Sequence, residues 1–287
     1  MKAIKMMGLA GLLLILAGCD ETRTVYVVAP DNQAPASPRG VTSITGDGEV
    51  VIQWFANGES DFDFYRVWRA TETNGLAGGP YTEIGTTTGT SFVDRNLPYG
   101  ITYFYAVSAC DDAGNESALS PEDVYDTPRP EGFDFMGDFI LYPISAGFNF
   151  SNSSPYGSRI AWDNLSADIY FEEASGSYFI KVTNVNVDIQ DMGYTDGFDD
   201  VSYSPTSGWS AVGRVEAIVG HTYVVWTADD HYAKIRITSM DGPNSTVYFD
   251  WGYQTDGNGL GQLELKPAVI KKPQHDPATY LRRTVAR

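Results

Sequence analysis

The chain is poor in the residues that most catalytic and metal sites use. Its 287 residues include 2 cysteines and 3 histidines. So few cysteines exclude a disulfide-stapled scaffold, and no clustered His or Cys ligands of a zinc enzyme occur. The sequence has no G-x-S-x-G nucleophile elbow, and the carboxylate pairs that any acidic chain offers do not by themselves indicate a glycosidase. We therefore expect a protein that binds a ligand and is not an enzyme, with no metal site.

Basic residues and long apolar runs are also scarce. The sequence holds 19 Lys and Arg against 37 Asp and Glu, a formal net charge of −18. Nucleic-acid binding needs clustered basic side chains to neutralise phosphates, so no nucleic-acid partner is expected. The apolar run from Met6 to Ala17 is shorter than the roughly 20 residues that a membrane-spanning helix needs.

The first nineteen residues have the pattern of an export signal. Lys2 and Lys5 precede the apolar run, and "LAGC" closes it at residues 16–19. This tetrapeptide resembles the bacterial lipobox, which implies lipidation of Cys19 and a mature chain anchored in the bacterial cell envelope. The alternative is a plain secretory signal that happens to end in Cys. We predict a signal peptide over residues 1–19 and a tether over 20–35, with the membrane leaflet left open.

Lipidation of Cys19 would leave Cys110 without an intramolecular partner. Cys110 ends the apolar segment "YAVSAC". A cysteine at the end of an apolar strand behaves as a small hydrophobic residue, and we expect this role in preference to that of a reactive thiol.

Residues 36–127 show the short alternating strands of a β-sandwich. Four segments carry β-branched and aromatic residues between turn clusters, namely "GEVVIQWFA", "DFDFYRVWRA", "YTEIGTTTGTSFVD" and "ITYFYAVSACD". Trp54, the segment "FYRVWRA" and the spacing of Leu97 to Tyr103 resemble a fibronectin type III domain. The resemblance implies that Trp54 fills the space between two sheets and that the Tyr103 hydroxyl bonds back to the backbone near Leu97. Such a sandwich is more often a spacer than a binding site.

A second β domain is predicted over residues 131–267, after the proline-rich junction "YDTPRPEG". This region holds 19 Asp and Glu against 6 Lys and Arg and has no long helical periodicity. Six segments have strand composition, namely "DFILYPI", "SADIYFEEA", "SYFIKVTNVNVDI", "RVEAIVGHTYVVWTA", "HYAKIRITSM" and "TVYFDWGYQ". We expect an all-β, antiparallel architecture in both domains. Residues 268–287 form a basic tail, either disordered or acting as an electrostatic arm.

A long irregular insert interrupts this domain from Gln190 to Ser210. Loops of that length are usually functional or mobile. Its acidic residues could hold Ca²⁺, but they lack D-x-D-x-D-G spacing, so a solvated loop is favoured; they are Asp188, Asp191, Asp196, Asp199 and Asp200. Its aromatic residues would serve a flat ligand or a sugar ring; they are Tyr194, Phe198, Tyr203 and Trp209.

The segment from Gly220 to Ile237 carries the last resemblance. "GHTYVVWTADDHYAKIRI" followed by "TVYFDWGYQTDG" is similar to the C-terminal part of the HmuY family of haem-binding lipoproteins, and "RIAWDNLSADIYF" to an earlier part of it. The pattern is a strand leading to Thr227, an acidic turn, then Tyr232 to Lys234 and a closing strand with Tyr-Gln. The resemblance implies a lipid-anchored β domain that holds haem through axial side chains.

Geometry limits which residues could serve as those axial ligands. In a hairpin that turns near Asp229, His221 and His231 lie at opposite ends, ~20 Å apart, and cannot share one iron. Pairing Trp226 with Ala233 or Lys234 would place Met240 beside His221, and His with Met suits haem iron. Met192 is a second candidate sulfur. The alternatives are structural: His221 as a cap of the strand entrance, and Met240 as a gap filler.

Three functional hypotheses follow from these patterns. The first is an envelope lipoprotein that binds haem or a related porphyrin, with the fibronectin module as spacer. The second is an envelope lipoprotein that binds carbohydrate or protein through exposed aromatic residues. The third is an accessory domain of an enzyme complex.

The lipobox gives a first testable prediction. Cells expressing the full chain with labelled palmitate should produce a labelled protein that partitions with membranes, and Cys19→Ala should abolish both properties because the thioether carries the acyl chains. Cys110→Ala should leave the label unchanged. Equal labelling of wild type and Cys19→Ala would contradict the prediction.

Overall fold

The computed structural model describes residues 12–13, 26–27, 31–73, 76–122, 124–151 and 156–255. Cys19, most of the predicted tether and the predicted basic tail at 268–287 lie outside these ranges. Strands β1 (Leu12–Leu13) and β2 (Tyr26–Val27) pair with each other. In the described part of the chain, no helix has the length and apolar character that crossing a membrane requires.

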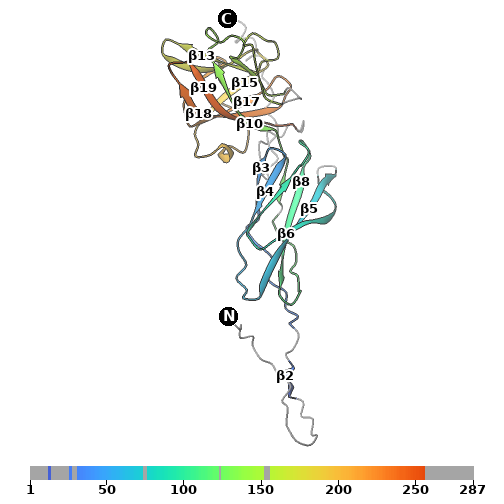
Figure 1. Ribbon diagram of the computed structural model, residues 1–287. Coiled ribbons are helices and arrows are strands. Elements are labelled where there is room, and N and C mark those ends of the chain that lie inside the picture. The colour runs from blue at the N-terminus through green and yellow to red at the C-terminus, as the bar shows by residue number, and fades with distance from the viewer. Residues whose placement is uncertain are drawn as a thin grey trace, which may run out of the picture.

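Two antiparallel sheets form the first sandwich (Figure 1). One sheet has the order β3-β4-β7, with bounds Thr42–Gly46, Glu49–Gln53 and Ser91–Arg95. The other has the order β6-β5-β8-β9, with bounds Leu76–Thr87, Phe62–Thr73, Tyr103–Asp111 and Val124–Asp126. This division of seven strands into three and four is that of a fibronectin type III sandwich, as the sequence predicts.

The core of the first sandwich confirms two predictions and leaves one unsupported. Trp54 is buried between the sheets and meets the Tyr65 ring at 5.2 Å, edge to face. Cys110 is buried, and its thiol is free. Tyr103 is buried too, but within residues 31–122 no hydrogen bond joins its hydroxyl to the backbone near Leu97. The Arg69 guanidinium instead lies 5.2 Å from the Tyr103 ring centroid.

A short link joins the two sandwiches and is anchored by a buried arginine. Arg129 forms ion pairs with Glu131 at 2.5 Å and Asp199 at 3.1 Å, and its backbone bridges to Asp47 of the first sandwich. The guanidinium is desolvated, so these carboxylates are needed to offset the cost of burying its charge.

The second sandwich packs two five-stranded antiparallel sheets. The first sheet has the order β10-β19-β18-β17-β15, with bounds Glu131–Gly137, Thr246–Tyr253, Tyr232–Asp241, His221–Trp226 and Asp188–Tyr194. The second has the order β12-β11-β13-β14-β16, with bounds Ser158–Ile160, Gly147–Asn149, Ile169–Ala174, Ser177–Val182 and Arg214–Glu216. The one helix in the described residues is the 3₁₀ turn η1 (Phe198–Asp200). The all-β, antiparallel prediction is confirmed.

One predicted strand is wrong. The segment "DFILYPI" from Asp138 onward forms turns, and strand β10 lies just before it. The Asp138 carboxylate accepts hydrogen bonds from the backbone N–H groups of Ile140 and Leu141. This local side-chain bonding stabilises a turn that apolar composition alone does not reveal.

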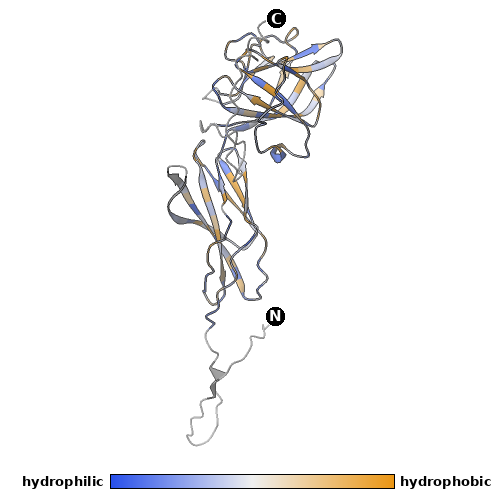
Figure 2. Ribbon diagram, turned by 180° about the vertical axis from the view of Figure 1, so that it is seen from behind, coloured by the Kyte–Doolittle hydropathy of each residue, from blue (hydrophilic) through white to orange (hydrophobic). Residues whose placement is uncertain are grey.

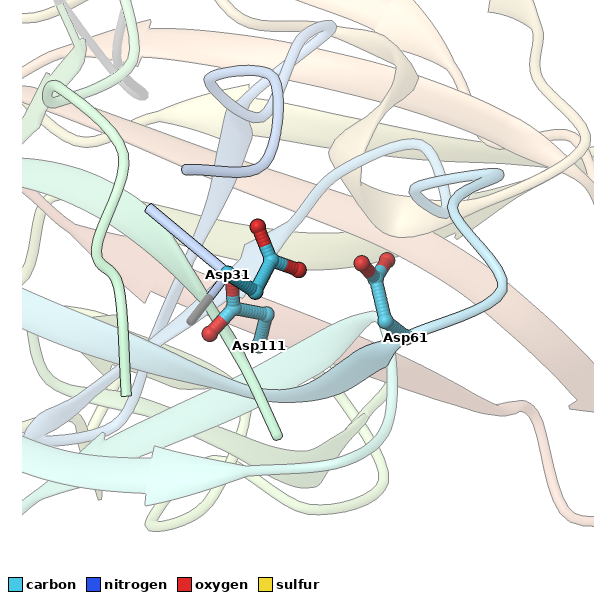
Figure 3. Close-up of side chains that lie close together, drawn as sticks. All are labelled: Asp31, Asp61 and Asp111. Atoms are coloured by element: carbon cyan, nitrogen blue, oxygen red, sulfur yellow. The ribbon is translucent and has the colours of Figure 1, made fainter. Parts of the chain in front are cut away.

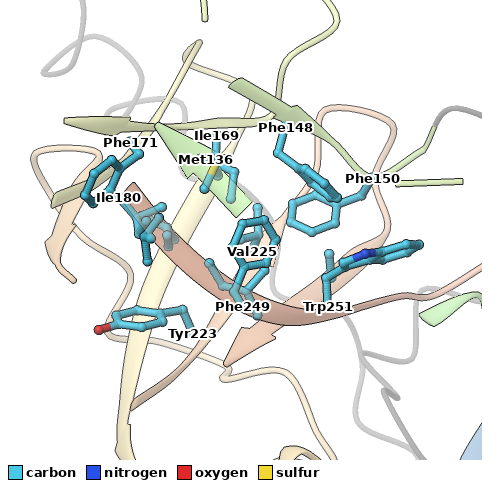
Figure 4. Close-up of a cluster of buried hydrophobic side chains, with 14 of the residues drawn as sticks. Met136, Phe148, Phe150, Ile169, Phe171, Ile180, Tyr223, Val225, Phe249 and Trp251 are labelled. Carbon is cyan, nitrogen blue, oxygen red and sulfur yellow. The ribbon is translucent and has the colours of Figure 1, made fainter. Parts of the chain in front are cut away.

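The inner faces of these two sheets make the main core (Figure 4). Alternate residues of each strand point inward, and Figure 2 shows the resulting bands of hydrophobic and hydrophilic residues along the strands. The fully buried Phe148 ring lies 5.2 Å from Phe249 and 5.7 Å from Trp251, which come from the opposite sheet. Cross-sheet aromatic contacts of this kind fix how the two sheets sit on each other.

The outer face of the first of these sheets is covered by the insert at residues 190–210. Trp226 and Tyr232 on this face pack with Trp209 and Met192 in a second apolar cluster. Contrary to the prediction of a solvated loop, the insert begins as strand β15 and continues as a packed cover.

A buried lysine fastens this cover to the sheet. Lys234 has no exposed surface, and its ammonium donates to the backbone oxygens of Phe198 at 2.7 Å and Val201 at 3.3 Å. It also pairs with the Asp199 carboxylate at 3.2 Å. Burial, together with the nearby Arg129 charge, lowers the pKa of Lys234 to about 8.

Candidate functional site

The outer face of the other sheet of the second sandwich borders a cavity, and the candidate site lies there. Ile169, Phe171 and Ile180 point into the core, so the alternating residues Tyr170 and Lys181 point outward. These two are cross-strand neighbours, and the Lys181 ammonium lies 5.3 Å from the Tyr170 ring centroid. Pairing between strands β13 and β14 therefore builds a platform with an aromatic ring and a cation.

Trp162 extends this platform from the loop that follows strand β12. Its ring centroid lies 5.5 Å from that of Tyr170 and 5.2 Å from that of Phe139, and the backbone N–H of Trp162 donates to the carbonyl of Pro143. Trp162 is half-buried, so part of its ring stays accessible while its neighbours fix its position. A half-exposed aromatic ring held in this way is a preformed surface for a ligand.

A cavity of about 580 Å³ lies over this platform. Its wall combines aromatic, amide, hydroxyl and exposed apolar groups, and its lining residues include Trp162, Asn164, Leu165, Tyr170, Lys181, Thr183, Asn184 and Val212. Leu165 and Val212 are 97% and 70% exposed, so they form a free apolar rim. We call this cavity the aromatic end of the groove.

A second cavity, of about 410 Å³, lies beside the first. The two share Asn164, Leu165 and Asn184 in their walls. The second is lined mainly by polar groups, among them Asn149, Ser151, Ser166, Asp168 and Asp229. We call it the polar end, and the two cavities together the groove.

Two carboxyl groups at the polar end have pKa values that are shifted in opposite directions. Asp168 is 4% exposed, and burial raises its pKa to about 7, with the Asp229 charge adding to the rise and the Phe150 N–H opposing it. Burial would also raise the pKa of Asp229, but hydrogen bonds from His231, Thr227 and Tyr253 outweigh it and lower that pKa. Tyr253 donates to Asp229 at 2.6 Å and Thr227 donates at 2.5 Å.

The structure places the predicted haem ligands on strands β15, β17 and β18. Strand β17 pairs with β18 through Trp226 opposite Tyr232, so the predicted register of Trp226 with Ala233 or Lys234 is wrong. Met240 packs against the main core, and Met192 packs against the cluster on the other face of the same sheet. At most one of the two sulfurs therefore lies on the same face of the sheet as His221.

The two histidines of the hairpin have local partners. Nδ1 of His221 lies 2.9 Å from both Asp191 carboxylate oxygens, and the His221 ring meets Tyr194 at 4.3 Å. His231 sits at the turn and bonds through Nδ1 to the Asp229 backbone oxygen at 2.9 Å. Their placement at opposite ends of the hairpin is as predicted, but no pair of axial ligands for haem forms around either ring in the described residues.

The aromatic residues of the insert do not form the predicted ligand platform. Trp209 packs inward, with its ring 5.8 Å from Trp226, and the Phe198 ring lies 4.1 Å from the buried Lys234 ammonium. Tyr203 is half-buried. Tyr194 is 76% exposed, but its neighbour is His221 and not another aromatic of the insert.

The acidic residues of the insert have partners of their own. Asp191 contacts His221, and Asp199 contacts Arg129 and Lys234. Asp200 accepts from the Gly197 N–H, and Asp188 is buried. These contacts account for Asp191, Asp199 and Asp200, whereas Asp196 is exposed.

One other acidic group has metal-ligand spacing, and it lies in the first sandwich (Figure 3). Oxygen atoms of Asp31, Asp61 and Asp111 all lie within 4.8 Å of one another, and within the described ranges no other set of three such side chains does so. Oxygen-only clusters of this size are typical of hard cations such as Ca²⁺. Asp111 is also a turn acceptor, with hydrogen bonds from the N–H groups of Ala113 and Asn115, so loop structure by itself explains its position.

Comparison with known proteins gives partial matches. No family model matches the chain. An amylopullulanase of Thermoanaerobacterium saccharolyticum is 34% identical over 114 residues, which is 38% of this chain and 8% of that enzyme. Exoglucanase B of Cellulomonas fimi is 33% identical over 106 residues, 36% of this chain and 9% of that enzyme. The chain thus spans less than a tenth of the length of these curated relatives.

Solved structures match over a similar share of the chain. An Fn3-like protein from Clostridium thermocellum is 31% identical and covers 32% of this chain and 92% of its own, with a TM-score of 0.27. A β-1,2-glucanase from Parabacteroides distasonis is 22% identical and covers 38% of this chain and 15% of its own, with a TM-score of 0.29.

Sequence reasoning missed the two residues that define the groove, Trp162 and Tyr170. Both lie in the segment "RIAWDNLSADIYF", where a tryptophan is followed by polar loop residues and then by an alternating strand. A tryptophan at a polar loop beside an outward-facing tyrosine was the available signal. The larger number of aromatic residues in the insert pointed elsewhere.

The buried Asp168 generates a pH prediction. Its pKa of about 7 in the folded chain is above the unfolded value of 3.8, so the folded state binds a proton more tightly. The stability from this group is therefore complete below about pH 4 and is lost as pH rises to about 7, by at most about 1.4 kcal/mol per pH unit. The free energy of unfolding is measured by urea titration with tryptophan fluorescence at each pH. In Asp168→Asn, this part of its fall between pH 4 and pH 7 should be absent.

The exposed Asp163, on the same loop, provides the matched control. The free energy of unfolding of Asp163→Asn should change between pH 4 and pH 7 as it does in the wild type. Buried Asp126 of the first sandwich, with a pKa of about 6, acts in the same direction and is common to all three proteins. Parallel curves for wild type and Asp168→Asn would contradict the assignment.

Proposed function

We propose that the second sandwich binds carbohydrate without catalysing a reaction on it, and that the fibronectin type III sandwich acts as its spacer. The observation that carries the proposal is the aromatic end of the groove, where Trp162 is fixed beside Tyr170 with part of its ring accessible. Amide side chains of Asn164 and Asn184 line the same cavity.

This set of groups matches the surface of a sugar. A pyranose ring has a face of C–H groups that packs on an aromatic ring and an edge of hydroxyl groups that both donate and accept hydrogen bonds. Asn side chains offer both functions, and Thr183 adds a hydroxyl. Haem iron is held most often by His, Met or Cys, and none of these is among the described residues that line the groove.

The curated relatives support a carbohydrate-related role. The amylopullulanases and exoglucanase B that resemble this chain are enzymes named for action on polysaccharides, and they match over a region that is small compared with each enzyme. A module shared by polysaccharide-acting proteins is consistent with this partial match.

The hydrogen bonds of the two carboxylates favour binding over catalysis. Each oxygen of Asp229 accepts a hydrogen bond, from Thr227 and from Tyr253. Asp168 is almost fully buried and accepts from the Phe150 N–H. A glycosidase needs one carboxylic acid and one carboxylate free to reach the scissile bond, whereas these two are tied to the protein. Together with the predicted lipidation of Cys19, this favours a polysaccharide-binding protein of the bacterial envelope.

Replacing the stacking residue tests the proposal. The protein without its first 19 residues should bind at least one glucan of a panel that includes amylose, pullulan and cello- and β-1,2-gluco-oligosaccharides. In isothermal titration, Trp162→Ala should weaken that binding by about tenfold or more, because an aromatic contact is worth about 1.5 kcal/mol beyond its buried area.

Phe133 supplies the matched control. It is 60% exposed on strand β10 and does not line the groove. Phe133→Ala should bind as the wild type does. Equal losses in both variants, or binding that Trp162→Ala leaves intact, would contradict the placement of the site, and no binding to any glucan would contradict the function.

A further inference from the structure

We infer that the groove holds a linear, neutral oligosaccharide across both of its ends, with one sugar unit on Trp162 and a following unit at the polar end, and that it excludes acidic glycans. This inference rests on the proposed function and specifies the class of glycan.

The first step is that the two cavities form one continuous groove. They share three lining residues, and two of these, Asn164 and Leu165, belong to the loop that joins strands β12 and β13. The third, Asn184, follows strand β14 from the same sheet. The shared residues place the two cavities side by side, so a chain that leaves the aromatic end passes over Asn164 and Leu165 to reach the polar end.

The second step is size. Cavities of about 300–1,000 Å³ accommodate small organic ligands. The two ends, of about 580 and 410 Å³, each fall in that range, so the aromatic end alone accommodates a monosaccharide. The polar end then offers room and contacts that only a longer chain can use.

The third step is the chemical difference between the ends. The aromatic rings lie at one end, where Trp162 and Tyr170 line the wall. The polar end has hydroxyl, amide and carboxylate groups, among them Ser151, Asn149 and Asp229. One unit would therefore bind by stacking and the next by hydrogen bonds to its hydroxyl groups.

The fourth step is charge. Asp163 lines the aromatic end, and Asp168 and Asp229 line the polar end. Lys181 is the one basic side chain in either lining, and Glu172 already pairs with it at 3.2 Å. A uronic acid would meet the Asp163 carboxylate at the aromatic end and the Asp229 carboxylate at the polar end, whereas a neutral sugar would find hydrogen-bond acceptors.

A chain-length series tests the inference. Malto- and cello-oligosaccharides of two to six units are titrated into wild type and Ser166→Tyr, which fills the polar end at an exposed loop position and leaves the aromatic end intact. In wild type, affinity should rise about tenfold or more from the dimer to the tetramer. Ser166→Tyr should bind the disaccharide with wild-type affinity, and its affinity should no longer rise with the length of the oligosaccharide.

Oligogalacturonate of four units is the probe for charge. It should neither bind nor displace the neutral tetramer in 0.15 M salt. Wild-type affinity that does not change with length, a gain that survives in Ser166→Tyr, or tight binding of oligogalacturonate would each overturn the inference while leaving carbohydrate binding in place. No binding of any glucan would overturn the proposed function itself. If Ser166→Tyr does not fold, the length series with wild-type protein and the competition with oligogalacturonate still test the inference.

Discussion

The packing of two sheets around Phe148, Phe249 and Trp251 is the contact on which the second sandwich depends. Because strand side chains alternate, each residue committed to this core sends its neighbours to an outer face. Tyr170 and Lys181 face outward because Ile169, Phe171 and Ile180 face inward. The candidate site is therefore a direct consequence of the core pattern.

The two outer faces of this sandwich differ in what packs against them. One is covered by the insert, which Lys234 fastens through its contacts to Phe198, Asp199 and Val201. The cost of burying that ammonium is offset by these oxygen partners. On the other outer face, Phe139 and Trp162 pack on Tyr170, and among the described residues the cavity beside them is bordered by exposed Leu165 and Val212. The insert packs as a cover on one sheet, and the proposed binding surface lies on the other sheet.

Local patterns predicted much of the fold. Alternation identified most of the strands in both sandwiches, and Trp54 and Cys110 are buried as their strand positions indicate. The prediction of a strand after Gly137 was wrong because the Asp138 side chain accepts hydrogen bonds that stabilise a turn. Amino-acid composition does not show this effect. The register of β17 with β18 was wrong by one or two residues because turn length fixes register, and the turn from Thr227 to His231 could not be assigned from its sequence.

The site was harder to predict because it is assembled from distant segments. The loop after β12, strands β13 and β14 and the hairpin turn at Asp229 meet only after both sheets have formed. His and Met are chemically reasonable haem ligands, and the sequence predicted a site from them. In the structure, the two methionine side chains pack on opposite faces of one sheet. Sequence spacing alone cannot show which strand faces will remain uncovered.

The most direct test of the account observes the tryptophan indoles themselves. The chain has 6 tryptophans, and each indole N–H gives its own signal in a ¹H–¹⁵N spectrum. On titration with a glucan that binds, the signal assigned to Trp162 by its substitution should shift progressively, while those of the buried Trp54 and Trp251 stay in place. A shift confined to Trp209 or Trp226 would place the ligand under the insert and contradict the account.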